Sequence, residues 1–243
     1  MRVKAIIAYD GTGYHGFQIQ KNALTIQEEL EKALARLTGC ETRVIAAGRT
    51  DAGVHAGGQV IAFDPEWKHS IEDLHRGMNA MLPDQIAVRA LEQVDPAFHP
   101  RFDAVRRYYR YTVYWDPVRN PLVARYSLHV SRALDLSAMQ TAAQSMVGCR
   151  DFWALGSPPQ GDNTIRDVFR ASWSFEDPWL FFDIEANAFL YRMVRMTVGT
   201  LLRVGYGAMT PKVFERILNT QDRDSAGPAV AAHGLCLEAV EYA

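Results

Sequence analysis

Along this chain of 243 residues, short continuous apolar runs alternate with stretches in which apolar positions recur every three or four residues. The continuous runs are rich in branched and aromatic side chains and end at turn-forming residues, which is typical of strands. The predicted strands are 3–9, 43–47, 59–64, 86–94, 106–115, 165–176, 179–189 and 235–242. Two of them form a hairpin-like pair around Asp177-Pro178.

The stretches with helical periodicity predict helices at 25–39, 70–82, 137–148, 190–205 and 211–219. In the first of them, Thr25 and Glu28 have the spacing of a capping box, and Gly39 ends the helix. Asp135 or Ser137 would cap the third.

The order of these elements indicates the fold class. Strands and helices do not alternate strictly, so we predict an α+β protein instead of a parallel α/β protein. The segment from Asp95 to Pro100 interrupts the pattern and is the best candidate boundary. We therefore predict an N-terminal half, residues 1–98, and a C-terminal half, residues 99–243, each combining several strands with helices.

Composition narrows the class further. Hydrophobic residues make up 48% and charged residues 22%, as in an ordinary globular protein. The formal net charge is −2, so a polyanionic partner must meet a locally basic surface. The three cysteines are far apart, the N-terminal apolar run is too short for a signal peptide, and no run reaches membrane-spanning length. We expect a cytoplasmic protein with reduced thiols and no membrane association.

The stretch AAGRTDAGVHAGGQV, residues 46–60, is the most unusual in the chain. It places a lone carboxylate, Asp51, among four glycines, an arginine and a histidine. Glycine loses more backbone freedom on folding than any other residue, so such a loop suggests that something approaches the backbone closely. The alternative is a tight turn in which Asp51 caps the next element.

Other motifs argue against several enzyme classes. Gly11, Gly13 and Gly16 follow a predicted strand as in a dinucleotide-binding fingerprint, but the next helix begins only at Thr25, too late to face a pyrophosphate. A dinucleotide-dependent oxidoreductase is therefore the remote alternative. The sequence has no Gly-x-Ser-x-Gly elbow, no Walker lysine motif and no His-Glu-x-x-His pair. We predict neither a cofactor nor a metal site.

Two stretches combine arginines with aromatic residues. Residues 101–110 hold four arginines and one acid, and residues 189–205 hold three arginines and no acid. On a strand, Tyr109, Tyr111 and Val113 would share one face. Guanidinium groups and ring faces suit the phosphate and base of an unstacked nucleotide. The alternative is that the tyrosines belong to the sheet core and the arginines to a solvated face.

Five blocks together resemble the tRNA pseudouridine synthase A family. They are GRTDAGVHA (48–56), YDGTGYHGFQIQ (9–20), HPRFDAVRRYYRY (99–111), NAFLYRMVRMTVG (187–199) and GLCL (234–237). Phe17 stands where the family usually has a tryptophan. The resemblance implies a pseudouridine synthase fold, with two similar halves, each a mixed and mainly antiparallel sheet flanked by helices, and an active-site cleft between them.

The resemblance also implies a reaction and its residues. Family members convert uridine to pseudouridine at positions 38 to 40 of the tRNA anticodon arm. Asp51 would be the catalytic aspartate, and Arg195 the cation that keeps Asp51 ionised in a water-poor site. Tyr109 would be the active-site tyrosine, which stacks on the uracil and whose hydroxyl could help remove the C5 proton. The further substrate-binding residues would be Arg49, Leu235 and His55.

Several points stay open at this stage. Asp51 could attack ribose C1′, attack uracil C6, or act as a base at C2′. An inactive RNA-binding protein of the same fold is the alternative function. The resemblance implies a homodimer with tRNA lying across both subunits, and we expect the polar loop 154–164 to contact RNA.

Overall fold

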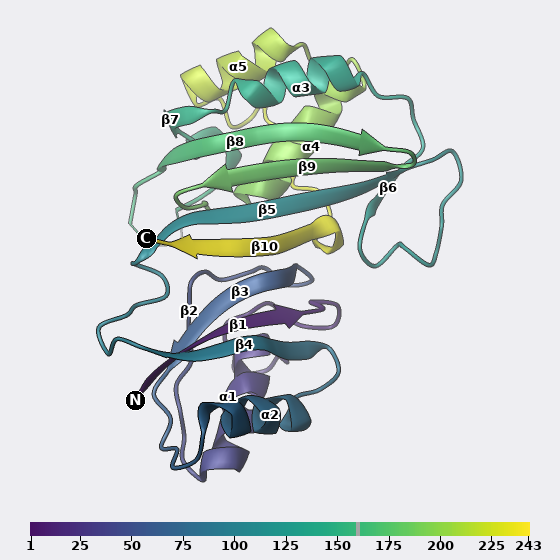
Figure 1. Ribbon diagram of the computed structural model, residues 1–243. Helices are drawn as coiled ribbons and strands as arrows, with labels where there is room; N and C mark the ends of the chain where they lie inside the picture. Colours follow the sequence, from purple (N-terminus) through teal and green to yellow (C-terminus); the bar gives the residue numbers. More distant parts are fainter. Residues whose placement is uncertain (159–160) are drawn as a thin grey trace. The chain divides into compact units, whose positions relative to one another are not determined.

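The computed structural model describes residues 1–158 and 161–243, and this part of the chain holds ten strands and five α-helices (Figure 1). It forms two compact units, which are Met1–Val105 with Cys236–Ala243 (unit 1) and Arg106–Leu235 (unit 2). The α+β class is confirmed. The sequence predicts a division at residue 98 and keeps the last strand in the C-terminal half, whereas in the structure most of that strand belongs to unit 1.

Unit 1 is a sheet with two helices. Its elements are β1 (Arg2–Tyr9), α1 (Ile26–Thr38), β2 (Ile45–Ala46), β3 (His55–Phe63), α2 (Ile71–Met81), β4 (Ile86–Val94) and β10 (Leu235–Tyr242). The main strands run in the order β4-β1-β3-β10, and β2 also pairs with β3. All of these pairs are antiparallel except β3 with β10, which is parallel.

The local causes of these elements are visible in the sequence. Alternate residues of β1 are buried, as expected for a strand with one face on the core. Helix α1 buries the apolar face predicted for it and ends at Gly39, whose φ of +73° is the left-handed conformation of a C-terminal stop. Thr25 does occupy the N-cap position, but the predicted capping box is wrong, because its side chain makes no cap hydrogen bond and its Oγ1 is buried without a partner.

Unit 2 combines the remaining strands with three helices. Its elements are β5 (Ala104–Trp115), β6 (Leu128–Val130), α3 (Leu136–Gln144), β7 (Gly148–Asp151), β8 (Ile165–Glu176), β9 (Trp179–Ala186), α4 (Met193–Gly205) and α5 (Pro211–Thr220). The strands β5-β9-β8-β7 pair antiparallel in that order, and the short β6 runs parallel beside β5. Figure 1 shows α4 behind this sheet, with α3 and α5 beside it.

The core of unit 2 lies between the sheet and α4. Tyr111 and Phe182 are directly opposite each other on β5 and β9, and both are fully buried. Helix α4 buries ten of its 13 residues, so it is the central helix of the unit.

The third helix ends at Gln144, four residues earlier than the sequence predicts, because the chain turns into β7 at Gly148, whose φ is +102°. Residues 159 and 160 of the polar loop predicted to contact RNA lie outside the described residues.

No helix in the described ranges is both long enough and apolar enough to span a bilayer.

Candidate active site

Asp51 lies in the loop that joins β2 to β3 in unit 1. Its side chain is half-buried, while Thr50 before it is buried and Arg49 is exposed. The loop ends where β3 begins at His55, four residues earlier than the strand that the sequence predicts. The carboxylate is therefore presented just ahead of a buried strand.

The glycine-rich loop after β1 holds the Asp51 loop in place. The backbone N–H of Phe17 donates to the Thr50 carbonyl at 3.1 Å, and that of Gly53 donates to the Tyr14 carbonyl at 3.2 Å. Gly16 has a φ of +91°, and a Cβ at this position would lie 2.7 Å from the Thr50 carbonyl oxygen. Protein packing therefore requires a glycine at position 16. Helix α1 begins only at Ile26, so no helix directly follows the dinucleotide-like motif.

A buried hydrogen bond fixes the residue before Asp51. The Tyr9 hydroxyl and Thr50 Oγ1 are 2.8 Å apart, and the Tyr9 side chain is almost completely buried. Burial raises the pKa of Tyr9 well above its ordinary value, so this phenol stays protonated at neutral pH. The backbone at Asp51 is therefore anchored on both sides, by Thr50 and by the Val54 N–H that donates to the Asp51 carbonyl at 3.1 Å.

His55 faces the interior of unit 1. It is 7% exposed, the Gly11 N–H donates to its Nδ1 at 3.0 Å, and the same nitrogen lies 3.1 Å from Asp10 Oδ1.

The glycines near Asp51 differ in what surrounds them. A Cβ on Gly58 would lie 2.3 Å from the Glu238 carbonyl oxygen, so a glycine is needed here for β3 to pack against β10. Around Gly48, by contrast, a Cβ would have no atom within 4 Å.

In unit 2, Tyr109 lies on β5 with part of its ring exposed. Its ring packs edge-on against Phe189, with the centroids 4.9 Å apart and an interplanar angle of 80°. Tyr111, two residues along the strand, is fully buried, and its hydroxyl donates to the Ala231 carbonyl at 2.8 Å. Of the two tyrosines, Tyr109 is thus the one whose ring can meet a ligand.

Arg195 lies on the first turn of α4 and contacts the segment before β10. Its Nε donates to the Val230 carbonyl at 2.8 Å, and the Val230 N–H donates to the Arg195 carbonyl at 3.2 Å. Burial raises the pKa of Tyr111, and the positive charge of Arg195 acts against this rise. Arg195 therefore belongs to the same cluster as Tyr111.

Leu235 is the first residue of β10 and is 6% exposed. Gly234 before it lies against the Tyr111 ring, where a Cβ would be 2.7 Å from Cζ. The structure thus places Arg49, Asp51 and His55 in unit 1, and Tyr109, Arg195 and Leu235 in unit 2.

Comparison with known proteins identifies the family. The sequence profile of a family described as tRNA pseudouridine synthase matches residues 5–103 and 142–243. A tRNA pseudouridine synthase A of Moorella thermoacetica is 44% identical over 245 residues, which cover 99% of each chain. The chain belongs to the tRNA pseudouridine synthase A family. It is therefore an isomerase that converts uridine to pseudouridine in tRNA.

Two further relatives have the same name and match over almost the full length of this chain. The tRNA pseudouridine synthases A of Geobacter sulfurreducens and Syntrophotalea carbinolica are 43% and 42% identical, and the matches cover 99% of this chain and 99% and 96% of theirs. A solved CRISPR-associated protein from Thermus thermophilus reaches a TM-score of only 0.22 at 12% identity over 84% of this chain and 97% of that chain, too weak to inform the fold. The profile match includes Asp51 and Arg195, while Tyr109 lies between its two segments.

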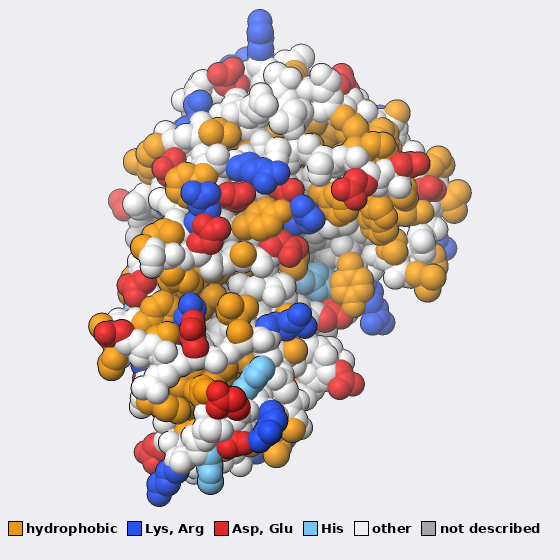
Figure 2. Space-filling model, in the orientation of Figure 1, with side chains coloured by type: hydrophobic (Ala, Val, Ile, Leu, Met, Phe, Trp, Pro, Cys, Tyr) orange, Lys and Arg blue, Asp and Glu red, His pale blue; other side chains and the backbone are white. Residues whose placement is uncertain are grey.

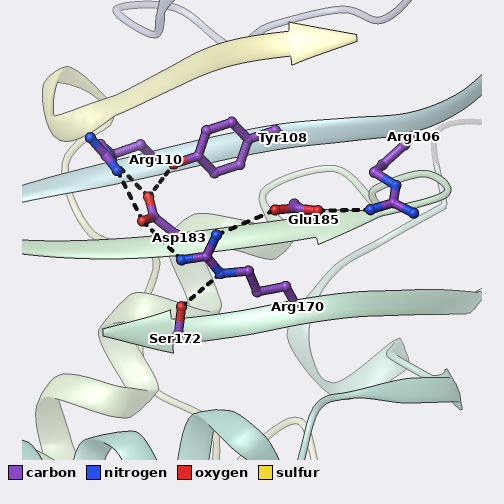
Figure 3. A network of polar contacts seen from close by, with 7 residues as sticks. All are labelled: Arg106, Tyr108, Arg110, Arg170, Ser172, Asp183 and Glu185. Atoms are coloured by element: carbon purple, nitrogen blue, oxygen red, sulfur yellow. Dashed lines mark hydrogen bonds and ion pairs between the residues drawn. The ribbon is translucent and has the colours of Figure 1, made fainter. Parts of the chain in front are cut away.

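The sequence did not single out the polar network beside the tyrosine of this synthase. On the sheet face opposite Tyr109, basic and acidic side chains alternate across three strands (Figure 3). The residues drawn there are Arg106, Tyr108, Arg110, Arg170, Ser172, Asp183 and Glu185. On the face that Figure 2 shows, Lys and Arg are likewise interspersed with Asp and Glu over the strands of unit 2.

Tyr108 gives this network a pH dependence. Burial raises the pKa of Tyr108 from 10.0 to about 12, helped by the Asp183 carboxylate, which accepts a hydrogen bond from the Tyr108 hydroxyl at 2.6 Å. The folded state binds this proton more tightly than the unfolded state, so the resulting stability is fully present below pH 10 and is lost as the pH rises through about 12.

We expect the free energy of unfolding of the wild type to fall, relative to Tyr108→Phe, over this window. Urea unfolding from pH 8 to 12 measures it, and a constant difference between the two proteins would contradict it.

No three His, Cys, Asp or Glu side chains gather as a metal site would require within residues 1–158 and 161–243. The titratable groups described at the candidate site residues are carboxylates, guanidiniums, an imidazole and phenols. Such groups suit nucleophilic or acid–base chemistry on an organic substrate.

Proposed function

We propose that this synthase modifies uridines at positions 38 to 40 of the tRNA anticodon arm. The proposal is supported by the five sequence blocks that resemble the A family and by the name shared by its relatives over almost their full length. It names the substrate position, which goes beyond family membership.

Within this proposal, Asp51 is the catalytic carboxylate. The reaction breaks the bond from uracil N1 to ribose C1′, turns the base and joins C5 to C1′, while C5 loses a proton and N1 gains one. Atoms and charge balance without an oxidant, a reductant or ATP, and we propose that no cofactor takes part. The observation that carries the role of Asp51 is that hydrogen bonds hold Thr50 before it and its own backbone carbonyl, which keeps the loop that presents its half-buried carboxylate in one place.

The other residues have supporting roles in this proposal. Arg195 supplies the positive charge that keeps the Asp51 carboxylate ionised where water is scarce. Tyr109 stacks on the extruded uracil, a role supported by its partly exposed ring and by the rigid edge contact with Phe189.

Three residues complete the proposed substrate site. The exposed Arg49 holds a phosphate of the target nucleotide or of its neighbour, and Leu235 packs against the base. For His55 we propose an indirect part in substrate binding, through the Asp10–Gly11 turn that its ring contacts.

We also propose that the synthase acts as a homodimer. The formal charge of −2 supports this, because two copies could concentrate their basic side chains on one tRNA-binding surface. Light scattering in solution gives the mass directly, and a monomer at working concentration would contradict the proposal.

The substrate position is tested on unmodified tRNA transcripts incubated with the purified protein alone. Carbodiimide treatment and primer extension then map pseudouridine. We expect it at uridines 38 to 40 and nowhere else, and no signal from transcripts in which those uridines are replaced by cytidine. Pseudouridine elsewhere in the tRNA, or a requirement for an added cofactor, would overturn the proposal.

A further inference from the structure

The residues on either side of Tyr109 both point to the opposite face of the sheet. In the pairing of β5 with β9, Tyr109 stands opposite Ile184, while its neighbours Tyr108 and Arg110 stand opposite Glu185 and Asp183. Side chains alternate along a strand, so what holds these two neighbours also fixes the direction in which Tyr109 leaves the sheet.

A single carboxylate holds both neighbours. Asp183 Oδ1 accepts from the Tyr108 hydroxyl at 2.6 Å and from Arg110 Nε at 2.7 Å, and Oδ2 accepts from Arg110 Nη2 at 3.0 Å (Figure 3). The bond to Arg110 is therefore bidentate, the form that constrains geometry most. Arg170 Nη2, from the next strand, approaches Oδ2 at 3.8 Å.

Because Asp183 is buried, its carboxylate depends on these protein partners for its hydrogen bonds. Its side chain is 4% exposed, so water cannot replace a lost partner. A buried ion pair is weak evidence for stability, because desolvation offsets much of the attraction, but it can fix one register among several. The Tyr108 phenol, whose pKa lies at about 12, keeps its proton at neutral pH and so remains a donor to Asp183.

Glu185 belongs to the same network but has different partners. It pairs with Arg106 Nη1 at 3.0 Å and with Arg170 Nη1 at 3.6 Å, and its side chain is 19% exposed. Neither arginine is adjacent to Tyr109 in the chain. Glu185 therefore offers a matched comparison with Asp183, on the same strand and the same face.

We propose that Asp183 is a positioning residue for Tyr109, because it holds Tyr108 and Arg110 and thereby fixes the register and twist of β5 at that point. The proposal rests on the role of Tyr109 put forward above. Asp183 touches no substrate; it acts through the strand. Misplacement of a catalytic group by about 1 Å can cost roughly 100-fold in rate, so the effect on pseudouridine formation is measurable.

The test reads the position of Tyr109 directly. 3-Fluorotyrosine is incorporated at position 109 in the wild type and in Asp183→Asn, Tyr108→Phe and Glu185→Gln, and the ¹⁹F resonance is recorded. Single-turnover rates and dissociation constants for a tRNA transcript are measured on the same variants without the label. Thermal unfolding of each variant controls for stability.

We expect Asp183→Asn to shift or broaden the resonance and to lower the single-turnover rate by about 10- to 100-fold with the dissociation constant for tRNA unchanged. Glu185→Gln should leave both close to wild type. Tyr108→Phe, which removes one of the three bonds and keeps the ion pair, should change both in the same direction by less. It provides the test if Asp183→Asn does not fold.

An unchanged resonance in Asp183→Asn, or equal changes in Glu185→Gln, would overturn the proposal. So would a displaced resonance with an unchanged rate, because the position of Tyr109 would then not matter for the reaction. If the wild type formed no pseudouridine at positions 38 to 40, the proposed function would fail, while the resonance would still report whether Asp183 positions Tyr109.

Discussion

Replacing Asp51 with asparagine is expected to reduce pseudouridine formation by about 10⁴-fold or more, while tRNA binding changes little. The amide has almost the same size as the carboxylate, and several of the hydrogen bonds that hold the loop involve Thr50, Gly53 and Val54. The loop should therefore keep its shape. What is lost is the ability to attack the substrate or to remove a proton. Single-turnover formation of pseudouridine and a filter-binding titration measure the two quantities separately.

Asp64→Asn is the matched control for this variant. Asp64 follows the far end of β3, as Asp51 precedes its near end, and its exposed carboxylate pairs with Arg2 at 2.5 Å. An exposed ion pair contributes little, so this variant should keep its activity. If Asp51→Asn retained a tenth of the wild-type rate, a catalytic role for this carboxylate would be ruled out. A tenfold loss of tRNA affinity would show that Asp51 serves binding as well.

Local signals in the sequence predicted much of the fold. The bounds of β4 and β10 coincide with the apolar runs 86–94 and 235–242, and α1 ends at the glycine predicted to stop it. These elements depend on periodicity and on turn residues, which act over a few positions. Short strands such as β6 and β7, with three and four residues, carry too little pattern to be predicted in this way.

What the sequence could not give depends on residues far apart in the chain. The pairing of Cys236 with His55 places β10 beside β3, and no local pattern signals a partner about 180 positions away. The glycines show the same limit. Gly16 and Gly58 are required by close backbone contacts within unit 1, whereas the sequence alone offered Gly16 as part of a dinucleotide-like motif and Gly58 as part of a loop that a ligand approaches closely.

The sequence proposed candidate site residues where a family motif carried them and not elsewhere. Asp183 belongs to no block used for the resemblance, yet a signal for it existed. An acid between apolar residues in a predicted buried strand must have a partner, and the neighbouring strand offers several arginines. Which arginine it meets depends on the register of β5 against β9, which only the structure provides.

Replacing Arg195 with methionine is expected to lower the rate of pseudouridine formation by about 100-fold. Methionine keeps much of the length and the apolar stem but removes the guanidinium, so an Asp51 carboxylate that depends on that charge would be less often ionised and less reactive. It also leaves the Val230 carbonyl without the donor that lies 2.8 Å away in the wild type. Single-turnover rates with saturating tRNA measure the loss.

Arg203→Met separates the charge at the site from the packing of the helix. Arg203 is half-buried on the same helix, and its Nη1 donates at 2.9 Å to the carbonyl of Ser225, so its removal costs α4 a comparable contact. If charge is the reason, Arg203→Met should stay within about threefold of the wild type, and Arg195→Lys should recover part of the activity lost in Arg195→Met, because lysine keeps the charge without the planar fork. Equal losses in Arg195→Met and Arg203→Met would assign the effect to α4 packing and would remove Arg195 from the proposed chemistry.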